Sequence, residues 1–156
     1  MITIRPRRSS DDPQLALLFE EMQRHYDVSC PPREMILADL AGLPTSVEIL
    51  VAEADGELIG LATFSAIYPG PGLKGGFFLK DLFVTQPARG SGVGKRLLRE
   101  IARLALGRGL TRMDWTADRN NAGLLAYYDR TGARREEDKV FFRLKGEALE
   151  AFADGA

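Results

Sequence analysis

The chain has 156 residues, a length that suits one domain built around one hydrophobic core. Its 21 basic and 22 acidic residues leave a formal net charge of -1, which argues against a general nucleic-acid binder. One cysteine, Cys30, excludes an internal disulfide, and no stretch approaches the ~18 apolar residues needed to cross a bilayer. Residues 1–8 lead into no long apolar run, so we expect no signal peptide. We therefore expect a single domain over residues 1–156, in the cytoplasm, with neither nucleic acid nor membrane as a partner.

The first third of the sequence predicts one short strand and two helices. Residues 2–6 alternate in polarity and end at a proline, which is typical of a strand. Asp12 and Pro13 favour a helix start, because Asp can accept hydrogen bonds from free amides and Pro fits the first turn. The apolar face of that helix would consist of Leu15, Leu18, Phe19, Met22 and Tyr26. A second helix is expected over residues 33–40.

The middle of the chain predicts three strands. Residues 47–54 and 58–68 are expected to pair, because Asp55-Gly56 between them is a strong two-residue hairpin turn. Residues 76–84 form a dense apolar run that contains a single charged pair, Lys80 and Asp81. Such a run indicates a central strand.

The last third predicts a long helix, followed by shorter elements. The long helix has an apolar face made of Val93, Leu97, Ile101, Leu104 and Ala105. A strand is then expected over residues 113–117, a helix over 121–129, a strand over 140–144 and a short helix over 147–152. The complete order is β-α-α-β-β-β-α-β-α-β, which predicts an α+β fold with a mixed sheet.

A glycine-rich loop, Arg89-Gly90-Ser91-Gly92-Val93-Gly94, lies between the central strand and the long helix. Its glycines allow a tight turn and a close backbone approach to a ligand. The helix that follows directs its free amides and the positive end of its dipole at the loop, which favours an anion such as a pyrophosphate. The alternative is a tight strand-to-helix turn that binds nothing.

Two nucleotide-binding templates can be tested against this loop by spacing. A P-loop requires four residues between its first Gly and the Gly-Lys pair, but Gly90 is one residue too close to Gly94. A dinucleotide fingerprint requires a third Gly where this chain has Lys95. Both templates fail, and the pattern that fits is Arg-x-x-Gly-x-Gly.

This pattern resembles the GNAT acetyltransferases, whose signature is a strand, then Gln/Arg-x-x-Gly-x-Gly/Ala, then a long helix. A second signature of that family, Asn with Tyr seven residues on and Gly four beyond, is matched by Asn121, Tyr128 and Gly132. Within the superfamily, the chain looks most like the diamine and thialysine N-acetyltransferase group. The segment Leu79-x-Asp81-Leu82-Phe83-Val84, Trp115 on the following strand and the C-terminal ending carry this finer likeness.

The resemblance implies a GNAT-like fold, a mixed and mostly antiparallel sheet flanked by helices, and a homodimer. It implies acetyl-CoA as the co-substrate and direct acetyl transfer to a primary amine of a small molecule. The backbone of the loop and of the central strand would hold the cofactor, the strand by pairing with pantetheine as an extra strand would. The cofactor-binding residues would be Leu82, Phe83, Val84, Arg89, Gly90, Ser91, Gly92, Val93, Gly94, Lys95 and Asn121. With one His and one Cys, the sequence offers no metal cluster.

Tyr128 corresponds to the family tyrosine that protonates the leaving CoA thiolate. Its alternative is a core tyrosine on a helix, which we expect for Tyr127 instead. Asn121 corresponds to the family asparagine that contacts the pantetheine arm, and its alternative is a helix N-cap. Both roles of Asn121 can coexist.

The general base is the part of the site that the resemblance does not supply. The diamine group has a Glu directly before the Asp of the central strand, whereas this chain has Lys80, a cation that would repel a polyamine. Asp81 remains as a candidate catalytic residue, and Asp27 or Asp114 could assist through water, although each could equally be a solvated acid. The acceptor would be bound by Tyr26, Asp27, Lys80, Asp114 and Trp115.

Two other functions stay open on sequence alone. A non-catalytic CoA-binding sensor or assembly domain would explain Lys80, but it has little reason to keep a phenol at Tyr128. The other alternative is acetylation of proteins at their N-termini or lysines.

Overall fold

The computed structural model describes residues 1–155, which divide into two compact units, Met1–Thr116 and the residues from Ala117 onward. The single domain predicted over residues 1–156 stays a prediction. None of the helices within residues 1–155 combines the length and the apolar character that a membrane crossing requires.

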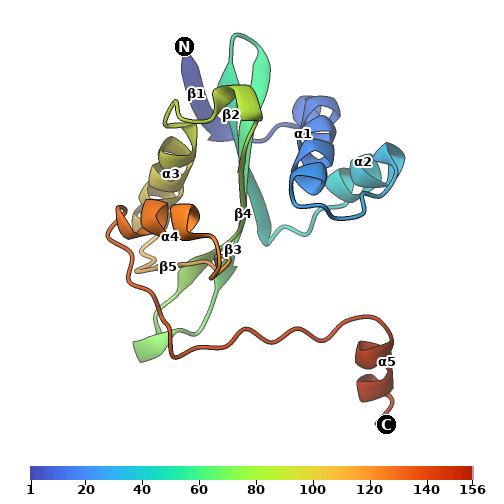
Figure 1. The fold of residues 1–156 in the computed structure, drawn as a ribbon, viewed down its shortest axis with the longest axis vertical. Helices are drawn as coiled ribbons and strands as arrows, with labels where there is room; N and C mark the ends of the chain where they lie inside the picture. Colours follow the sequence, from blue (N-terminus) through green and yellow to red (C-terminus); the bar gives the residue numbers. More distant parts are fainter. Residues whose placement is uncertain (156) are drawn as a thin grey trace. The chain divides into compact units, whose positions relative to one another are not determined.

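The first unit is built on a five-stranded sheet whose order, β1-β2-β3-β4-β5, follows the chain (Figure 1). The strands are β1 (Ile2–Pro6), β2 (Val47–Ala54), β3 (Glu57–Ile67), β4 (Gly76–Val84) and β5 (Met113–Asp114). The first four pair antiparallel, and β5 pairs parallel to β4 through Phe77↔Met113 and Phe78↔Asp114. The mixed, mostly antiparallel sheet that the sequence predicts is confirmed.

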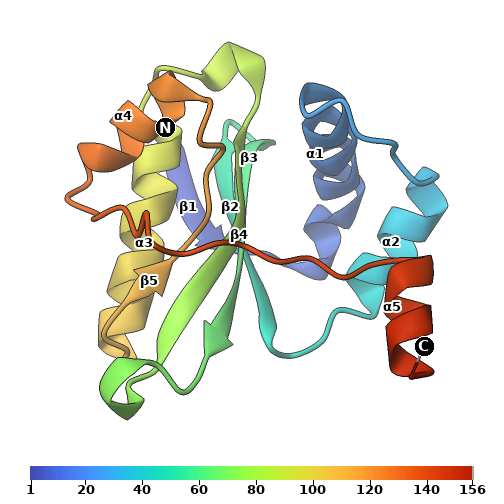
Figure 2. The same ribbon diagram turned by 60° about the horizontal axis from the view of Figure 1, so that its bottom comes forward.

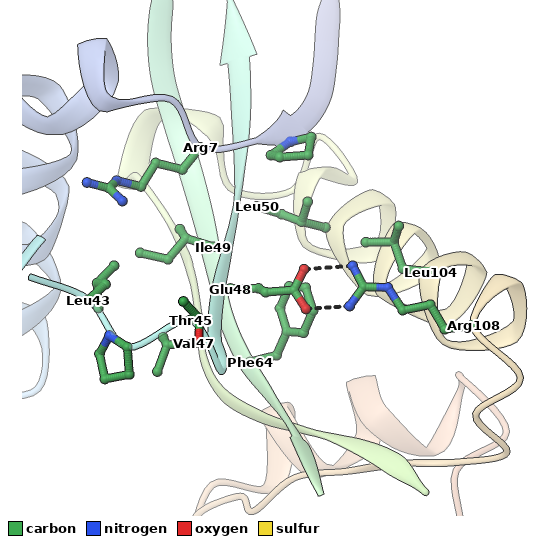
Figure 3. Close-up of a pocket in the computed structure, with 12 residues that line it drawn as sticks. Arg7, Leu43, Thr45, Val47, Glu48, Ile49, Leu50, Phe64, Leu104 and Arg108 are labelled. Carbon is green, nitrogen blue, oxygen red and sulfur yellow. Dashed lines mark hydrogen bonds and ion pairs between the residues drawn. The ribbon is translucent and has the colours of Figure 1, made fainter. Parts of the chain in front are cut away.

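Helices cover both faces of this sheet, with α1 (Asp12–His25) and α2 (Arg33–Ala41) on one face and α3 (Val93–Gly107) on the other (Figure 2). Alternation along β2 divides the core between them. Ile49 and Val51 pack in the cluster that contains Leu15 and Leu18 of α1. Leu50 points toward the α3 side (Figure 3). Short 3-10 turns, η1 (Ser9–Asp11), η2 (Pro71–Leu73) and η3 (Gln86–Ala88), join some of the elements.

The hairpin turn between β2 and β3 forms as predicted. Asp55 and Gly56 have φ angles of 52° and 86°. Two consecutive left-handed residues are the backbone conformation of a type I′ turn, which matches the twist of the flanking strands.

α1 begins at Asp12, as predicted, but the Asp12 side chain does not cap the helix. Asp12 is the first helical residue, and its carboxylate accepts two hydrogen bonds from Arg7, at 2.6 Å each. The preceding Asp11 accepts from the Arg8 backbone amide and from both terminal nitrogens of Arg5. The side chains of Arg5 and Arg7, together with the Arg8 backbone amide, therefore occupy both carboxylates, including that of Asp12, which the sequence pattern predicts as a helix cap.

The second unit contains α4 (Ala122–Asp129) and α5 (Glu147–Ala153), joined by a segment without helix or strand (Figure 1). The strand predicted over residues 140–144 is therefore wrong for this structure, and the strand predicted over 113–117 is reduced to Met113–Asp114. A strand persists only where a neighbour takes up its backbone hydrogen bonds. Within residues 1–155, no strand pairs with residues 140–144.

Candidate active site

The glycine loop adopts a backbone conformation that only glycine accepts easily. Gly90 has a φ of 81°, and Gly92, the N-cap of α3, has a φ of 84°. A Cβ atom added to either residue would meet nothing within 4 Å. The outer surface of the loop is thus uncovered in the described chain, so a ligand can approach its backbone directly.

The first turn of α3 supplies hydrogen-bond donors to this surface. The first backbone bond of the helix runs from the Arg96 amide to the Gly92 carbonyl, at 3.1 Å. The amides of Val93, Gly94 and Lys95 find no acceptor in the part of the chain that the structure describes. Free amides and the positive end of a 15-residue helix make a favourable site for a phosphate group.

The other side chains of the loop hold it against the end of β4. Arg89 donates from Nε to the Val84 carbonyl at 3.0 Å, and its guanidinium lies 5.5 Å from the centroid of the Phe83 ring. The Ser91 hydroxyl donates to the Ala88 carbonyl at 2.5 Å. These contacts fix the position of the loop backbone relative to the strand.

β4 leaves part of one edge open. It pairs with β3 from Gly76 to Val84, but with β5 only at Phe77 and Phe78. The Thr85 amide donates to Ile59 of β3, so the backbone groups of Phe83 also face β3, whereas those of Leu82 and Val84 face the open edge. Among the described residues, no strand occupies that edge beyond Phe78.

A β-bulge lies in the middle of this strand, at Lys80. Thr63 of β3 pairs with Asp81, and the next residue, Phe64, pairs with Leu79, so that Lys80 has no partner. A bulge bends the strand and increases its twist. The bend in β4 thus lies at Lys80 and Asp81, the charged pair within the apolar run.

The two charged residues at the bulge have different surroundings. Asp81 has a side chain that is 28% exposed, and it accepts a hydrogen bond from the Thr63 hydroxyl at 3.0 Å. Lys80 is 66% exposed, and its Nζ lies 3.9 Å from Asp81 Oδ1. The carboxylate is therefore held in place, whereas the ammonium group reaches solvent.

The C-terminal end of α1 lies close to this pair. Burial raises the pKa of the Tyr26 hydroxyl, and the charge of Asp81 raises it further, while Arg89 opposes the shift. The His25 ring lies 5.1 Å from the Tyr26 ring and 6.0 Å from the Phe83 ring. The structure thus brings together the predicted residues Tyr26, Asp81 and Arg89. Asp27, which follows the C-cap residue Tyr26 and has a φ of 52°, is exposed.

Asp114 is paired with an arginine. Arg112 Nε lies 3.1 Å from Asp114 Oδ2. The two atoms form an ion pair without the geometry of a hydrogen bond. Asp114 pairs in the sheet with Phe78, two positions before the bulge. Trp115, the next residue, is half-buried. The ion pair makes Asp114 a weaker candidate for a base than Asp81.

The remaining predicted residues belong to the second unit. Asn121 is the N-cap of α4, and its Oδ1 accepts from the Leu124 amide at 3.0 Å. Tyr128 is half-buried on that helix, with its ring 5.3 Å from the Tyr127 ring. The Tyr127 hydroxyl is buried without a hydrogen-bond partner among the described residues, and burial raises its pKa. The approach of Asn121 and Tyr128 to the glycine loop stays a prediction.

A separate pocket of about 290 Å³ lies at the opposite end of α3 (Figure 3). Glu48 and Arg108 face one another there, with Nη2 and Oε2 2.8 Å apart. The lining residues include none of those predicted for the site. No group of three or more His, Cys, Asp or Glu suited to a metal ion occurs in residues 1–155.

Residues 14–133 match the Acetyltransferase (GNAT) family, which is more than half of the chain. The chain belongs to the GNAT acetyltransferase family. Members of this family use acetyl-CoA, and the predicted membership of the GNAT acetyltransferases is confirmed. The family match spans both the glycine loop and the second signature at Asn121, Tyr128 and Gly132.

Two named relatives of this GNAT chain are amino-acid acetyltransferases. It is 28% identical over 142 residues to L-ornithine N5-acetyltransferase NATA1 of Arabidopsis thaliana, covering 91% of this chain and 57% of the relative. It is 29% identical over 79 residues to thialysine N-epsilon-acetyltransferase of Caenorhabditis elegans, covering 49% of each chain. The aligned segments thus cover about half the length of each of these relatives.

Solved structures share the GNAT fold over almost the whole chain. An integron cassette protein from V. cholerae has a TM-score of 0.86 and 29% identity, with 97% of each chain covered. The aminoglycoside N-acetyltransferase AAC(6')-Iy, solved with CoA, has a TM-score of 0.76 and 22% identity, with 92% of this chain and 94% of that chain covered. The α+β GNAT fold predicted from the sequence is confirmed.

One contributor to the site could not be found from sequence. Thr63 holds Asp81 by a hydrogen bond across 18 positions of the chain, and a threonine in a strand is otherwise an ordinary β-forming residue. Only the register between β3 and β4, including the bulge, brings the two together.

Proposed function

We propose that this protein transfers the acetyl group of acetyl-CoA directly to the primary amine of a small amino acid. The observation that carries the proposal is the arrangement at the end of β4. An uncovered glycine loop, free helix amides, an open strand edge and a fixed carboxylate occur within one unit.

The chain offers a matching group for each part of the cofactor. The amides of Val93, Gly94 and Lys95 suit the pyrophosphate, because they lie at a helix N-terminus and donate to no acceptor in the described chain. The outward backbone groups of Leu82 and Val84 suit the amides of pantetheine, which would add to the sheet as a strand does. The cofactor would supply the activated thioester, and the protein would hold that thioester in position for attack by the amine.

Asn121 can serve the cofactor without giving up its structural role. Its Oδ1 accepts from the Leu124 amide and caps α4, which leaves its side-chain NH2 group to donate elsewhere. We propose that this NH2 group contacts pantetheine. Both sequence-based roles of the residue would then be fulfilled by different atoms.

The acceptor amine must lose a proton before it can attack. A primary amine has a pKa of ~10.4, so its deprotonation at neutral pH costs about 4 kcal/mol. We propose that Asp81 accepts this proton, directly or through a water molecule, because Thr63 holds its carboxylate at the open side of β4. Tyr128 would donate a proton to the leaving thiolate.

Lys80 favours an acceptor that carries a carboxylate. Its ammonium group is exposed and only 3.9 Å from Asp81, so an ammonium-rich polyamine would meet a like charge. A zwitterionic amino acid could place its amine near Asp81 and its carboxylate at Lys80. The names of two relatives, which specify ornithine and thialysine, support this choice. We propose that Tyr26, Asp27, Asp114 and Trp115 complete the acceptor site.

A panel of acceptors tests the proposal. CoA release would be measured with acetyl-CoA and ornithine, lysine, thialysine, spermidine, putrescine and a peptide with a free N-terminus. We expect the highest kcat/KM with one of the amino acids. Spermidine as the best acceptor would reject the role of Lys80, and a strong preference for the peptide would indicate a protein N-acetyltransferase.

A further inference from the structure

An arginine directly before β5, Arg112, is enclosed by two glycines. A Cβ atom added to Gly70 would overlap Arg112 Nη1, and one added to Gly76 would lie 2.5 Å from Arg112 Cγ. Gly70 has a φ of -110° and a ψ of -174°, an extended conformation that any residue adopts. The glycine at position 70 is therefore required by the arginine side chain beside it and not by the backbone.

The enclosed guanidinium faces Asp114, with the two side chains in an ion pair at 3.1 Å. Arg112 is the covered partner, because its side chain is 27% exposed and its Nε is buried. Asp114 is the accessible partner, at 46% exposed. The pair thus presents to solvent a carboxylate that is held from behind.

Asp114 projects from the face of the sheet that α1 and α2 cover. Phe64 lies on the α3 side (Figure 3), and the Phe77 ring packs against it, with centroids 4.8 Å apart. Side chains alternate along a strand, so Phe78 lies on the opposite face. Asp114 is the register partner of Phe78 in β5 and shares that face.

Asp81 projects from the same face. Thr63 is next to Phe64 in β3 and therefore lies on the α1 side, where its hydroxyl donates to Asp81. Asp114 stands beside Phe78, three residues before Asp81, which separates the two carboxylates by about 10 Å along the strand. The two amines of an extended ornithine or lysine are about 6–8 Å apart, and each forms hydrogen bonds of about 2.8 Å. One diamino acid can therefore reach both carboxylates.

We propose, on the basis of the proposed transfer to an amino acid, that Asp114 binds the ammonium group of the acceptor that is not acetylated. Arg112 is then a positioning residue, which holds Asp114 for this contact. The reacting amine lies at Asp81, and the carboxylate of the acceptor lies at Lys80. Each charged group of a diamino acid thus meets an opposite charge in the first unit, and a monoamine leaves the contact to Asp114 unmade.

Two pairs of acceptors isolate this contact. 5-Aminopentanoate is ornithine without its α-ammonium group, and 6-aminohexanoate is lysine without it. In the wild type, kcat/KM should be at least about tenfold higher for each diamino acid than for its matched monoamine, because a charged hydrogen bond is lost with the group. Asp114→Asn should bring that ratio close to one by raising KM for the diamino acid. Asp39→Asn, an exposed residue of α2, is the matched control and should leave the ratio unchanged.

Gly70→Ala tests the positioning role without changing any charge. The added methyl group displaces the Arg112 guanidinium, so the same ratio should fall several-fold. Gly42→Ala is the control, because its Cβ would meet only the Ala38 carbonyl, at 3.5 Å. Circular dichroism and calorimetric CoA titration establish that the fold and the cofactor site survive in both variants.

The outcomes separate this proposal from the proposed function. Equal kcat/KM for ornithine and 5-aminopentanoate in the wild type, or an unchanged ratio in Asp114→Asn, would overturn the role of Asp114 and leave transfer to amino acids standing. An equal loss with both acceptors in Gly70→Ala would overturn the positioning role of Arg112. A wild-type protein that acetylates none of the four acceptors would overturn both the inference and the proposed function.

Discussion

At the scale of single residues, the neighbours Lys80 and Asp81 have different surroundings. Asp81 is held by Thr63, whereas Lys80 is mostly in solvent and contacts Asp81 only at 3.9 Å. An exposed pair of this kind contributes about 0–1 kcal/mol, so a substrate carboxylate can draw Lys80 away from Asp81 at little cost. Lys80 is thus suited to recognition and Asp81 to proton transfer.

Lys80→Glu should shift the choice of acceptor toward polyamines. The change replaces a cation beside the open edge of β4 with an anion, which attracts a second ammonium group and repels a carboxylate. We expect the ratio of kcat/KM for spermidine to that for ornithine to rise at least about tenfold, because reversing one charge near a substrate is worth more than ~1.4 kcal/mol. Lys74→Glu, in the exposed β3–β4 loop, is the control. An unchanged ratio would show that Lys80 does not face the acceptor.

Tyr128→Phe should reduce the chemical step and leave CoA binding nearly intact. The change removes only the hydroxyl, and general acid catalysis contributes about 10²–10⁴-fold, so kcat should fall within that range. Tyr127→Phe is a matched control on the same helix. Its hydroxyl is buried without a described partner, so its removal should leave kcat unchanged and keep or raise the melting temperature. Equal kcat for Tyr128→Phe and wild type would assign the acid to another group.

The sequence predicted many of these residues, but not their partners. The glycine loop, Asp81 and Tyr128 were identifiable from spacing and resemblance within short segments. The Thr63–Asp81 hydrogen bond and the Arg112–Asp114 ion pair depend on strand register. The pairing of Asp12 with Arg7 likewise depends on how β1 meets α1.

At the scale of elements, the N-terminus of α3 combines a left-handed backbone conformation with the place where we propose that the pyrophosphate binds. Gly92 has a left-handed conformation at the N-cap, and the three amides after it have no acceptor in the described chain. A residue with a Cβ would disfavour that conformation, even though the space around it is open. The glycine is therefore required by the backbone rather than by packing.

Gly92→Ala and Gly107→Ala should change stability in opposite directions. At Gly92 the left-handed φ of 84° makes alanine unfavourable by about 1 kcal/mol, and a shifted loop should weaken CoA binding. Gly107 lies in the last turn of α3, where an added Cβ would meet no atom within 4 Å, so alanine there should stabilise by about 0.5–1 kcal/mol. Urea unfolding and calorimetric CoA titration would measure both effects. Destabilisation of similar size at both sites would contradict the conformational argument.

The prediction of helices, strands and turns succeeded where a short stretch of sequence determines the element. It failed where the element depends on a partner far away in the chain. The 3.6-residue period of α3 and the Asp55-Gly56 turn are contained in short windows, and both formed as predicted. The strand over residues 140–144 has a good local pattern, but no described neighbour. Strand formation depends on a partner that the pattern cannot specify.

At the scale of the whole first unit, a cluster of charged side chains connects the N-terminal strand β1 to β2 and to the start of α1. Arg5 of β1 donates to both carboxylate oxygens of Asp11, at 2.7 and 2.9 Å, and to Glu53 of β2 at 2.8 Å. Asp11 is only 7% exposed. The cluster therefore joins β1, β2 and the start of α1 in one network of charge-assisted hydrogen bonds.

Asp11→Asn should destabilise the protein at neutral pH but not in acid. The hydrogen bond from Arg5 lowers the pKa of Asp11 below its ordinary value of 3.8. Its stabilisation is thus complete above that value and is lost as the pH falls through the lower folded-state pKa. We expect a loss of about 1–3 kcal/mol at pH 7, and little or none at an acid pH well below 3.8. Urea unfolding at both pH values measures it, and a loss independent of pH would point to packing instead.

The bulge at Lys80 amounts to one surplus residue in β4. Removing that residue would leave every remaining cross-strand pair intact, because Leu79 and Asp81 already face the consecutive residues Phe64 and Thr63. In the shorter chain, the hydrogen-bond ladder between β3 and β4 would be more regular. The β4 strand would also be straighter, because a bulge bends the strand that contains it. The cross-strand pairing of the sheet therefore does not require the bulge, and its removal would straighten the strand along which we propose that pantetheine binds.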